Sequence, residues 1–257
     1  MDELKLETRG HCAWLTVARP AKRNAMSLAM WRALPGLIER VSNERAARVF
    51  ILQGSHERVF SAGADIEEIE QHSRDDQAAV SFMKAVEKGT DALAQCPIPT
   101  IAMIRGDCIG GGIEMAMACD IRFASRASRF GVPPAKLGVL YSFASTKRLV
   151  GLVGPGKAKD LLFSGRMFDA AEAYSMGLIE RLSPPEDIVA TTTAYANLLS
   201  QRSPASIRGA KQMVTAMTDG LDEENDFVRR LRIETFLGED LKEGVRAFLE
   251  KRAPSFR

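Results

Sequence analysis

The spacing of apolar residues changes along the chain, and the change separates short strands from longer helices. The apolar runs that predict strands are Cys12–Val17, Val49–Gln53, Thr100–Ile104 and Ile121–Ala124. The segments with helical spacing are Leu28–Val41, Asp76–Ala94 and Gly111–Ala118. Because strands and helices alternate, we expect an α/β fold with parallel strands and crossover helices.

After Ser145 the pattern becomes mostly helical. Its breaks fall at Gly151, Gly154-Pro155-Gly156, Gly177 and Pro184-Pro185. Two later segments, Asp222–Leu237 and Asp240–Lys251, place apolar residues at helical spacing among many charges, as helices at a surface or a subunit interface do. We therefore expect a core formed by residues 1–195 and a C-terminal helical region formed by residues 196–257.

The segment from Glu67 to Asp76 is the most polar run of the chain. Such a charge run is typical of a solvated face. We expect it to form a mobile surface loop near the ligand pocket.

Composition excludes several classes of protein. A chain of 257 residues with 46% hydrophobic content can bury a full core. Its net charge of +2 and 7% aromatic content, with scattered basic residues, do not indicate a nucleic-acid binder. No apolar run approaches the roughly 18 residues of a membrane span, and the acidic N-terminus has no apolar core behind it. We expect a soluble, untargeted, cytoplasmic protein.

Cysteine and histidine usage indicates neither a metal site nor a disulfide framework. The cysteines are Cys12, Cys96, Cys108 and Cys119, and the histidines are His11, His56 and His72. They show no CxxC pair and no ligand spacing, so we expect reduced structural thiols and no metal. No nucleophile-elbow motif is present, so nucleophilic catalysis is not expected.

The candidate chemistry lies in the glycine run that precedes Glu114. Gly110, Gly111 and Gly112 open a predicted helix, and Glu114 falls in its first turn. Free backbone N–H groups and the helix dipole favour negative charge at such a terminus, while glycine allows a ligand close to the backbone. The run therefore predicts an oxyanion site beside an acid. An ordinary turn with a first-turn Glu is the alternative.

A second turn of small residues precedes another acidic helix start, at Ala62-Gly63-Ala64-Asp65. One N–H donor from Ala64 and one from Gly111 would polarise a carbonyl held between them and stabilise an enolate. Asp65 itself is predicted to cap the following helix rather than to take part in catalysis.

Six landmarks in order resemble the crotonase superfamily, also called the enoyl-CoA hydratase/isomerase family, over nearly the whole chain. They are Arg19-Pro20 through Asn24-Ala25, Phe60–Ile66, Gly110–Glu114, Cys119-Asp120, Phe130-Gly131 and Phe248–Arg252. The resemblance implies a spiral of repeated ββα units and a C-terminal helical trimerisation region. It also implies homotrimers that often pair into hexamers.

The same resemblance implies an acyl-CoA thioester as substrate, with coenzyme A as part of the substrate and no separate cofactor. By position, the oxyanion hole falls on the N–H groups of Ala64 and Gly111, with Glu114 as the acid/base. The coenzyme A set implied by the resemblance is Lys22, Arg23, Ala25, Ala62, Asp65, Ile66, Phe248 and Lys251. The last two match a tail motif that often comes from a neighbouring subunit. For the lysines and Arg23 the alternative is plain solvation, and for Phe248 it is helix packing.

One position departs from the hydratases of this family. They carry a second catalytic Glu twenty positions after the first, where this chain has Pro134. Water addition asks for one group that activates water and one that delivers a proton, and proline does neither. Glu114 would need water held by other groups, or another carboxylate, with Glu67, Glu68 and Glu70 as candidates.

The segment Phe130–Tyr141 is similar to methylmalonyl-CoA decarboxylases, which also have Pro at this position and keep the early Glu and a later Tyr, here Tyr141. Decarboxylation forms the same enolate without a water-activating base. Those decarboxylases, however, carry His where Ala64 stands, and Tyr141 could instead cap a buried wall.

Three hypotheses follow. The first is a lyase that uses Glu114 as the single acid/base, either a non-standard hydratase or a decarboxylase. The second is an enoyl-CoA isomerase, although such isomerases often use the position of Pro134. The third is a CoA-thioester binding protein with little catalysis.

Overall fold

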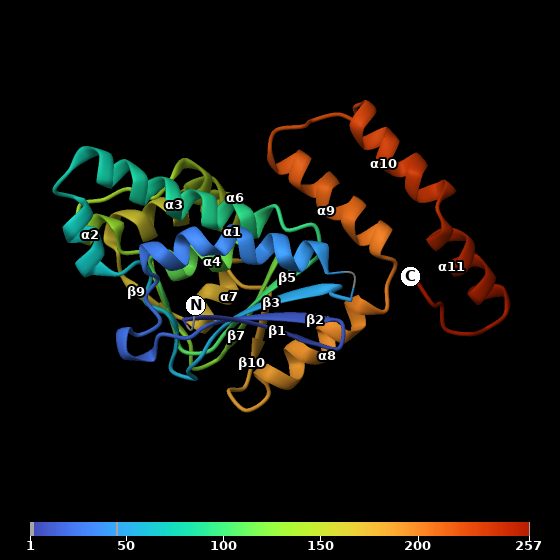
Figure 1. Ribbon diagram of the computed structural model, residues 1–257, viewed down its shortest axis with the longest axis horizontal. Helices are drawn as coiled ribbons and strands as arrows, with labels where there is room; N and C mark the ends of the chain where they lie inside the picture. The colour runs from blue at the N-terminus through green and yellow to red at the C-terminus, as the bar shows by residue number, and fades with distance from the viewer. Residues whose placement is uncertain (1–2, 45, 257) are drawn as a thin grey trace.

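The computed structural model describes residues 3–44 and 46–256. It contains two sheets wrapped by helices, and a group of C-terminal helices that extends from this body (Figure 1). The larger sheet has the strand order β1-β2-β3-β5-β7-β10. Its strands are β1 (Leu4–Arg9), β2 (Cys12–Val17), β3 (Val49–Gly54), β5 (Thr100–Ile104), β7 (Ile121–Ser125) and β10 (Arg181–Ser183). All neighbours are parallel except β1 and β2, which form an antiparallel pair.

The smaller sheet has the order β4-β6-β8-β9. Its strands are β4 (Val59–Ser61), β6 (Asp107–Ile109), β8 (Arg129–Gly131) and β9 (Met167–Asp169). Each is three residues long, which is too short for periodicity to reveal. The four predicted strands are confirmed, two of them one residue longer than expected, whereas β1, β10 and the smaller sheet were not predicted.

The strands enter the two sheets in turn. β3, β5 and β7 lie in the larger sheet, and the next strands along the chain, β4, β6 and β8, lie in the smaller one before the chain turns into helices. This repeat of two strands and a helical segment confirms the predicted α/β spiral of ββα units.

The helices before the C-terminal region begin with the short η1 (Pro20–Lys22). The others are α1 (Leu28–Asn43), α2 (Ile66–His72), α3 (Asp76–Ala94), α4 (Gly111–Ala118), α5 (Pro134–Leu137), α6 (Phe143–Ser164), α7 (Ala170–Ser175) and α8 (Ile188–Ser200). Within α6, Gly154 has a φ of 78°, so the helix is interrupted at the predicted glycine break. The predicted helices 28–41, 76–94 and 111–118 are confirmed as α1, α3 and α4.

Side chains of β2 show how the larger sheet is buried on both faces. Ala13 and Leu15 pack with Trp31 of α1 in the main core, whereas Trp14 packs with Ala196 of α8 on the other face. In a parallel sheet that is covered on both faces, the sequence of each strand is a continuous apolar run, and the strands predicted here have this pattern. The expected boundary between residues 195 and 196 therefore falls inside a helix that packs on the sheet.

The expected loop over 67–76 is wrong for most of its length, because α2 occupies Ile66–His72. The Asp65 carboxylate caps this helix by accepting a hydrogen bond from the N–H of Glu67 at 3.0 Å, and Glu67 and Glu68 place negative charge in the first turn. Both features stabilise a helix start, so a run of acidic residues forms a solvated helix here.

The C-terminal helices are α9 (Pro204–Thr218), α10 (Asp226–Leu237) and α11 (Glu239–Leu249). The predicted helix from 222 begins at Asp226 instead, because the Asn225 side chain caps it by accepting from the N–H of Val228 at 3.0 Å. The predicted helix 240–251 corresponds to α11. In Figure 1 these helices lie beyond α8, at the opposite end of the molecule from α2.

Candidate active site

The two glycine turns named from the sequence meet at the start of α4. Gly63 has a φ of 96° and Gly110 a φ of 57°, conformations that favour glycine. A Cβ on Gly63 would lie 2.7 Å from the backbone nitrogen of Gly111, and a Cβ on Gly111 would lie 3.3 Å from the nitrogen of Ala64. The turns therefore pack directly against each other, as a shared oxyanion site requires.

Two backbone donors are available where the turns meet. Among the described residues, neither the N–H of Ala64 nor the N–H of Gly111 donates a hydrogen bond. The N–H groups of adjacent residues are used: Asp65 donates to Met26 O at 3.0 Å and Gly110 donates to Gly131 O at 3.0 Å. A carbonyl oxygen placed between the two free donors would be stabilised as it gains charge.

Glu114 lies in the first turn of α4 with 7% of its surface exposed. Burial raises the pKa of its carboxyl from 4.5 to about 7, and the Ser145 hydroxyl and the Arg148 charge oppose this rise only in part. A carboxyl with a pKa near neutrality can both give and take a proton at physiological pH. Glu114 therefore has the ionisation that an acid/base needs.

Three polar side chains from one segment surround Glu114. Burial raises the pKa of the Tyr141 hydroxyl well above its usual value, and the charge of Glu114 adds to this effect. Ser145 lies in the first turn of α6, and Arg148 follows one turn later. Arg148 Nη2 donates to Asp91 Oδ1 at 2.7 Å. The segment from Tyr141 to Arg148 thus forms a polar wall beside the carboxyl.

This wall contains buried polar atoms that make no hydrogen bond. Among the described residues these atoms include Tyr141 Oη, Arg148 Nη1, Trp31 Nε1 and the more distant Arg105 Nε. Trp31 belongs to the same site, because its ring carbon Cζ2 would lie 3.1 Å from a Cβ on Gly111. Unpaired buried donors are uncommon in proteins, and an ordered water, an ion or a catalytic role can account for them.

Of these residues only Tyr141 was named from the sequence. Ser145 and Arg148 were missed because they reach the site through the packing of α6 on α4, and Trp31 was missed because its ring reaches Gly111 from α1. The Ser142 side chain accepts a hydrogen bond from the N–H of Ser145 at 3.1 Å. This cap could have located the start of α6 from the sequence, but not the helix on which α6 packs.

The position of the family's second Glu holds no carboxylate, since buried Pro134 forms the first turn of α5. The three carboxylates considered as replacements have other partners. Glu67 pairs with Lys22 at 2.5 Å, Glu70 pairs with Arg74 at 2.6 Å, and Glu68 accepts from the N–H of Leu28 at 2.5 Å. Of these four carboxylates, Glu114 is the one that lies in the helical turn containing Gly111.

Part of the residue set named for coenzyme A gathers beside the Ala62–Asp65 turn. The N–H of Ala62 donates to Arg23 O at 3.0 Å, which brings the segment containing Ala25 against the turn. Asp65 accepts from Arg19 Nη1 at 2.7 Å and caps α2, the structural role predicted for it.

The charged and exposed members of the set have these positions. Lys22 pairs with Glu67, Arg23 Nη2 donates to Asp107 Oδ2 at 2.7 Å, and Ile66 is 55% exposed. Lys22 and Arg23 are thus each paired with a carboxylate beside the turn.

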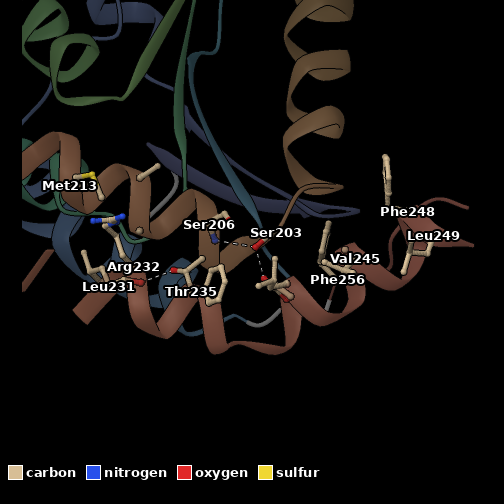
Figure 2. A pocket seen from close by; sticks show the side chains of 16 residues that line it. Ser203, Ser206, Met213, Leu231, Arg232, Thr235, Val245, Phe248, Leu249 and Phe256 are labelled. Carbon is tan, nitrogen blue, oxygen red and sulfur yellow. Dashed lines mark hydrogen bonds between the residues drawn. The ribbon is translucent and has the colours of Figure 1, made fainter. Parts of the chain in front are cut away.

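Phe248 and Lys251 lie elsewhere in the chain. Phe248 is on α11 and 83% exposed, and Lys251 follows that helix with a φ of 53°. Phe248 lines a hollow of about 720 Å³ between α9, α10 and α11, which Figure 2 shows with Leu249, Val245 and Phe256. Within one chain, α11 is separated from α2 by the length of the molecule (Figure 1).

Other kinds of site are not seen in residues 3–44 and 46–256. No group of three or more His, Cys, Asp or Glu side chains is placed to hold a metal ion, and all four cysteines are buried and free. Over the same residues, every helix is too short or too polar to cross a membrane.

Comparison with known proteins identifies the class that this fold and site define. The model of the enoyl-CoA hydratase/isomerase family matches residues 7–257. The chain is 37% identical over 243 residues to a protein of Mycobacterium tuberculosis named as a probable enoyl-CoA hydratase, covering 94% of this chain and 93% of that one. It is 33% identical to a short-chain-enoyl-CoA hydratase of Clostridium acetobutylicum, covering 98% and 96%.

Solved structures support the same family. A crystal structure of an enoyl-CoA hydratase/isomerase family protein from Hyphomonas neptunium superposes with a TM-score of 0.96 at 37% identity, covering 99% of this chain and 97% of that one. The chain belongs to the enoyl-CoA hydratase/isomerase family and is an enzyme of that family acting on acyl-CoA.

Proposed function

We propose that this enzyme hydrates 2-enoyl-CoA thioesters through an enolate, with Glu114 as its single acid/base. One observation carries the proposal: a buried carboxyl with a pKa of about 7 stands one helical turn from the unpaired N–H of Gly111. The thioester oxygen would accept hydrogen bonds from Gly111 and Ala64. The names of the relatives as enoyl-CoA hydratases support the same reaction.

A single carboxyl is sufficient for the proton balance. The water oxygen bonds to Cβ, and the electrons of the double bond move to the thioester oxygen to form the enolate. Glu114 takes one proton from the water and supplies one to Cα, so it ends as it began. The buried Ser145 hydroxyl acts on the Glu114 carboxyl and would help to hold the water beside it. This arrangement replaces the carboxylate missing at Pro134.

The coenzyme A portion would lie along the turn formed by Ala25, Ala62, Asp65 and Ile66, with Lys22 and Arg23 at its rim. Phe248 and Lys251 would reach the nucleotide end from a neighbouring copy of the chain, because their own helix is far from this turn. Coenzyme A enters as part of the substrate, and the proposed reaction needs no further cofactor.

Glu114→Gln tests the proposal. We expect hydration of crotonyl-CoA to fall at least about 100-fold, while the Kd for butyryl-CoA changes little, because the amide keeps the shape and loses the proton transfer. Glu87→Gln is the matched control, since Glu87 is an exposed carboxylate whose charge acts on Glu114. Equal rates in wild type and Glu114→Gln would overturn the proposal. Tight binding without turnover in the wild type would favour the binding-protein hypothesis.

A second candidate is decarboxylation of a methylmalonyl-type thioester, which Pro134 favours because this reaction needs no water-activating base. The variant Pro134→Glu helps to distinguish hydration from decarboxylation. If hydration is limited by the missing carboxylate, this variant hydrates crotonyl-CoA faster than the wild type. Release of CO₂ from methylmalonyl-CoA by the wild type, lost in Glu114→Gln, would favour decarboxylation. Isomerisation receives less support, because the later acid position is again Pro134.

A further inference from the structure

We propose that Trp31 is a positioning residue for the reaction: its ring, packed between α3 and α4, holds the N–H of Gly111 where the thioester oxygen gains charge. The inference rests on the proposed function to the extent that this N–H must be one of the two oxyanion donors. It adds a residue on α1, outside both glycine turns, that acts through Gly111 rather than on the substrate.

The ring of Trp31 reaches from one helix to the next. A Cβ on Gly89 of α3 would lie 3.0 Å from Trp31 Cε3, and a Cβ on Gly111 of α4 would lie 3.1 Å from Trp31 Cζ2. These two carbons are opposite corners of the six-membered ring, so one flat, rigid group fills the distance between the two glycines. A phenyl ring is shorter than an indole and would leave one of these contacts open.

The position of the ring is fixed by packing alone. Trp31 has no exposed surface, and among the described residues its Nε1 has no hydrogen-bond partner. Protein interiors are close-packed and transmit strain, so a ring that moves or shrinks shifts the atoms that it touches. The backbone of Gly111 is one of the two groups that would follow the ring.

The start of α1 is tied to the other donor as well. Met26 N–H donates to Gly63 O at 2.7 Å, and Met26 O accepts from the N–H of Asp65 at 3.0 Å. These two bonds bracket Ala64 and hold its turn without using its N–H. Trp31 follows five positions later, at the start of α1. One short segment therefore holds both donors, the first through backbone hydrogen bonds and the second through the indole ring.

The distance between the two donors matters more for the rate than for binding. Loss of one oxyanion donor typically costs about 100-fold to 1,000-fold in rate, and a displacement of about 1 Å can cost about 100-fold. These donors act most strongly on the charge that develops on the thioester oxygen, whereas the uncharged thioester gains less from them. A displaced Gly111 should therefore impair enolate formation and leave the affinity for an unreactive thioester largely unchanged.

Acetoacetyl-CoA tests the inference through a spectroscopic signal that does not need hydration. On ionisation this thioester loses a proton from the carbon between its two carbonyls to the medium, and the resulting enolate absorbs in the near ultraviolet. At saturation, Trp31→Phe should hold at least about fivefold less enolate than the wild type, while its Kd for butyryl-CoA changes by less than about threefold.

Trp14→Phe is the matched control. Trp14 and Trp31 are the two tryptophans of the chain, and Trp14 packs on the other face of the larger sheet, against Ala196. Thermal melting should show that both variants lose stability, because both lose part of a buried ring, but Trp14→Phe should keep the wild-type enolate signal. An equal loss of enolate in both variants, or no loss in folded Trp31→Phe, would overturn the inference. A wild type that gives no enolate signal would overturn it too.

If Trp31→Phe does not fold, Gly89→Ala replaces it. The added Cβ would press on Cε3 from the side of α3 and shift the ring toward Gly111. A weaker enolate signal is expected, and an unchanged signal in folded Gly89→Ala would refute the positioning role.

The two proposals fail separately. A wild type whose enolate signal depends on Trp31 but which does not hydrate crotonyl-CoA would refute the proposed function alone. A wild type that hydrates crotonyl-CoA, with the same enolate signal in folded Trp31→Phe, would refute this inference alone.

Discussion

Glu114 is a buried acid whose ionisation is costly to the fold. The usual pKa of 4.5 is raised to about 7 because burial disfavours the carboxylate. Between these two values the folded protein binds more protons than the unfolded chain, so stability falls as pH rises from 4.5 to 7. Above pH 7 the ionised Glu114 lowers the free energy of unfolding by its full amount, about 3 kcal/mol. The protein keeps this group although it destabilises the fold at neutral pH, as residues at functional sites often do.

Glu114→Gln should remove this pH dependence. We expect the free energy of unfolding of the variant, relative to wild type, to increase by about 3 kcal/mol between pH 4 and pH 8, because the amide does not ionise. Urea denaturation of both proteins across that range measures the difference. Parallel curves for the two proteins would show that the pKa of Glu114 is not raised.

Helix α4 begins with two glycines that lie close to neighbouring parts of the chain, and the two contacts have different consequences. Gly112 packs on β4, where a Cβ would lie 2.5 Å from Ser61 O, a backbone atom that cannot move without shifting the strand. At Gly111 a Cβ would face the Trp31 ring and the nitrogen of Ala64 at 3.1 and 3.3 Å, the space in which the thioester oxygen is proposed to bind. One glycine therefore serves packing and the other serves the site.

Alanine at these two positions should separate stability from activity. Gly112→Ala is expected to lower the free energy of unfolding by about 2 kcal/mol or more through overpacking. Gly111→Ala is expected to cost less stability but to lower kcat/KM for crotonyl-CoA about 100-fold, because its Cβ obstructs the oxyanion donors. Thermal melting and steady-state kinetics test both. A fully active Gly111→Ala would remove its N–H from the proposed site.

The whole molecule leaves a large apolar surface on its C-terminal helices. Phe236, Leu237, Phe248 and Leu249 are between 67% and 83% exposed, and several of them line the hollow in Figure 2. Monomeric proteins rarely expose so many large apolar side chains together. The trimer or hexamer that the sequence resemblance predicts would cover this surface if the copies met through these helices.

Phe236→Glu should break this association. Light scattering after size exclusion is expected to show trimers or hexamers for the wild type and smaller species for the variant, because a buried charge would oppose docking. Tyr174→Glu is the control, because Tyr174 lies on α7, outside the C-terminal helices, and is 53% exposed; this variant should assemble normally. A wild type that is monomeric at assay concentration would contradict the prediction.

Prediction from the sequence succeeded where a local pattern was enough. The long apolar strands, α1, α3 and α4, and the capping role of Asp65 all follow from periodicity and capping chemistry within a few residues. The strands of the smaller sheet could not be predicted in this way, because a segment of three residues is too short to show periodicity. The loop expected over 67–76 failed because polarity alone does not distinguish a solvated helix from a coil.

The sequence by itself determined the family and the spiral of ββα units, and it predicted Ala64 and Gly111 as the two donors, since these depend on ordered motifs and on glycine at particular places. Only the tertiary structure decided which side chains surround Glu114. Ser145 and Arg148 are more than thirty positions along the chain and reach the carboxyl because α6 packs on α4. The raised pKa has the same origin, because burial is a property of the assembled core and no local sequence encodes it.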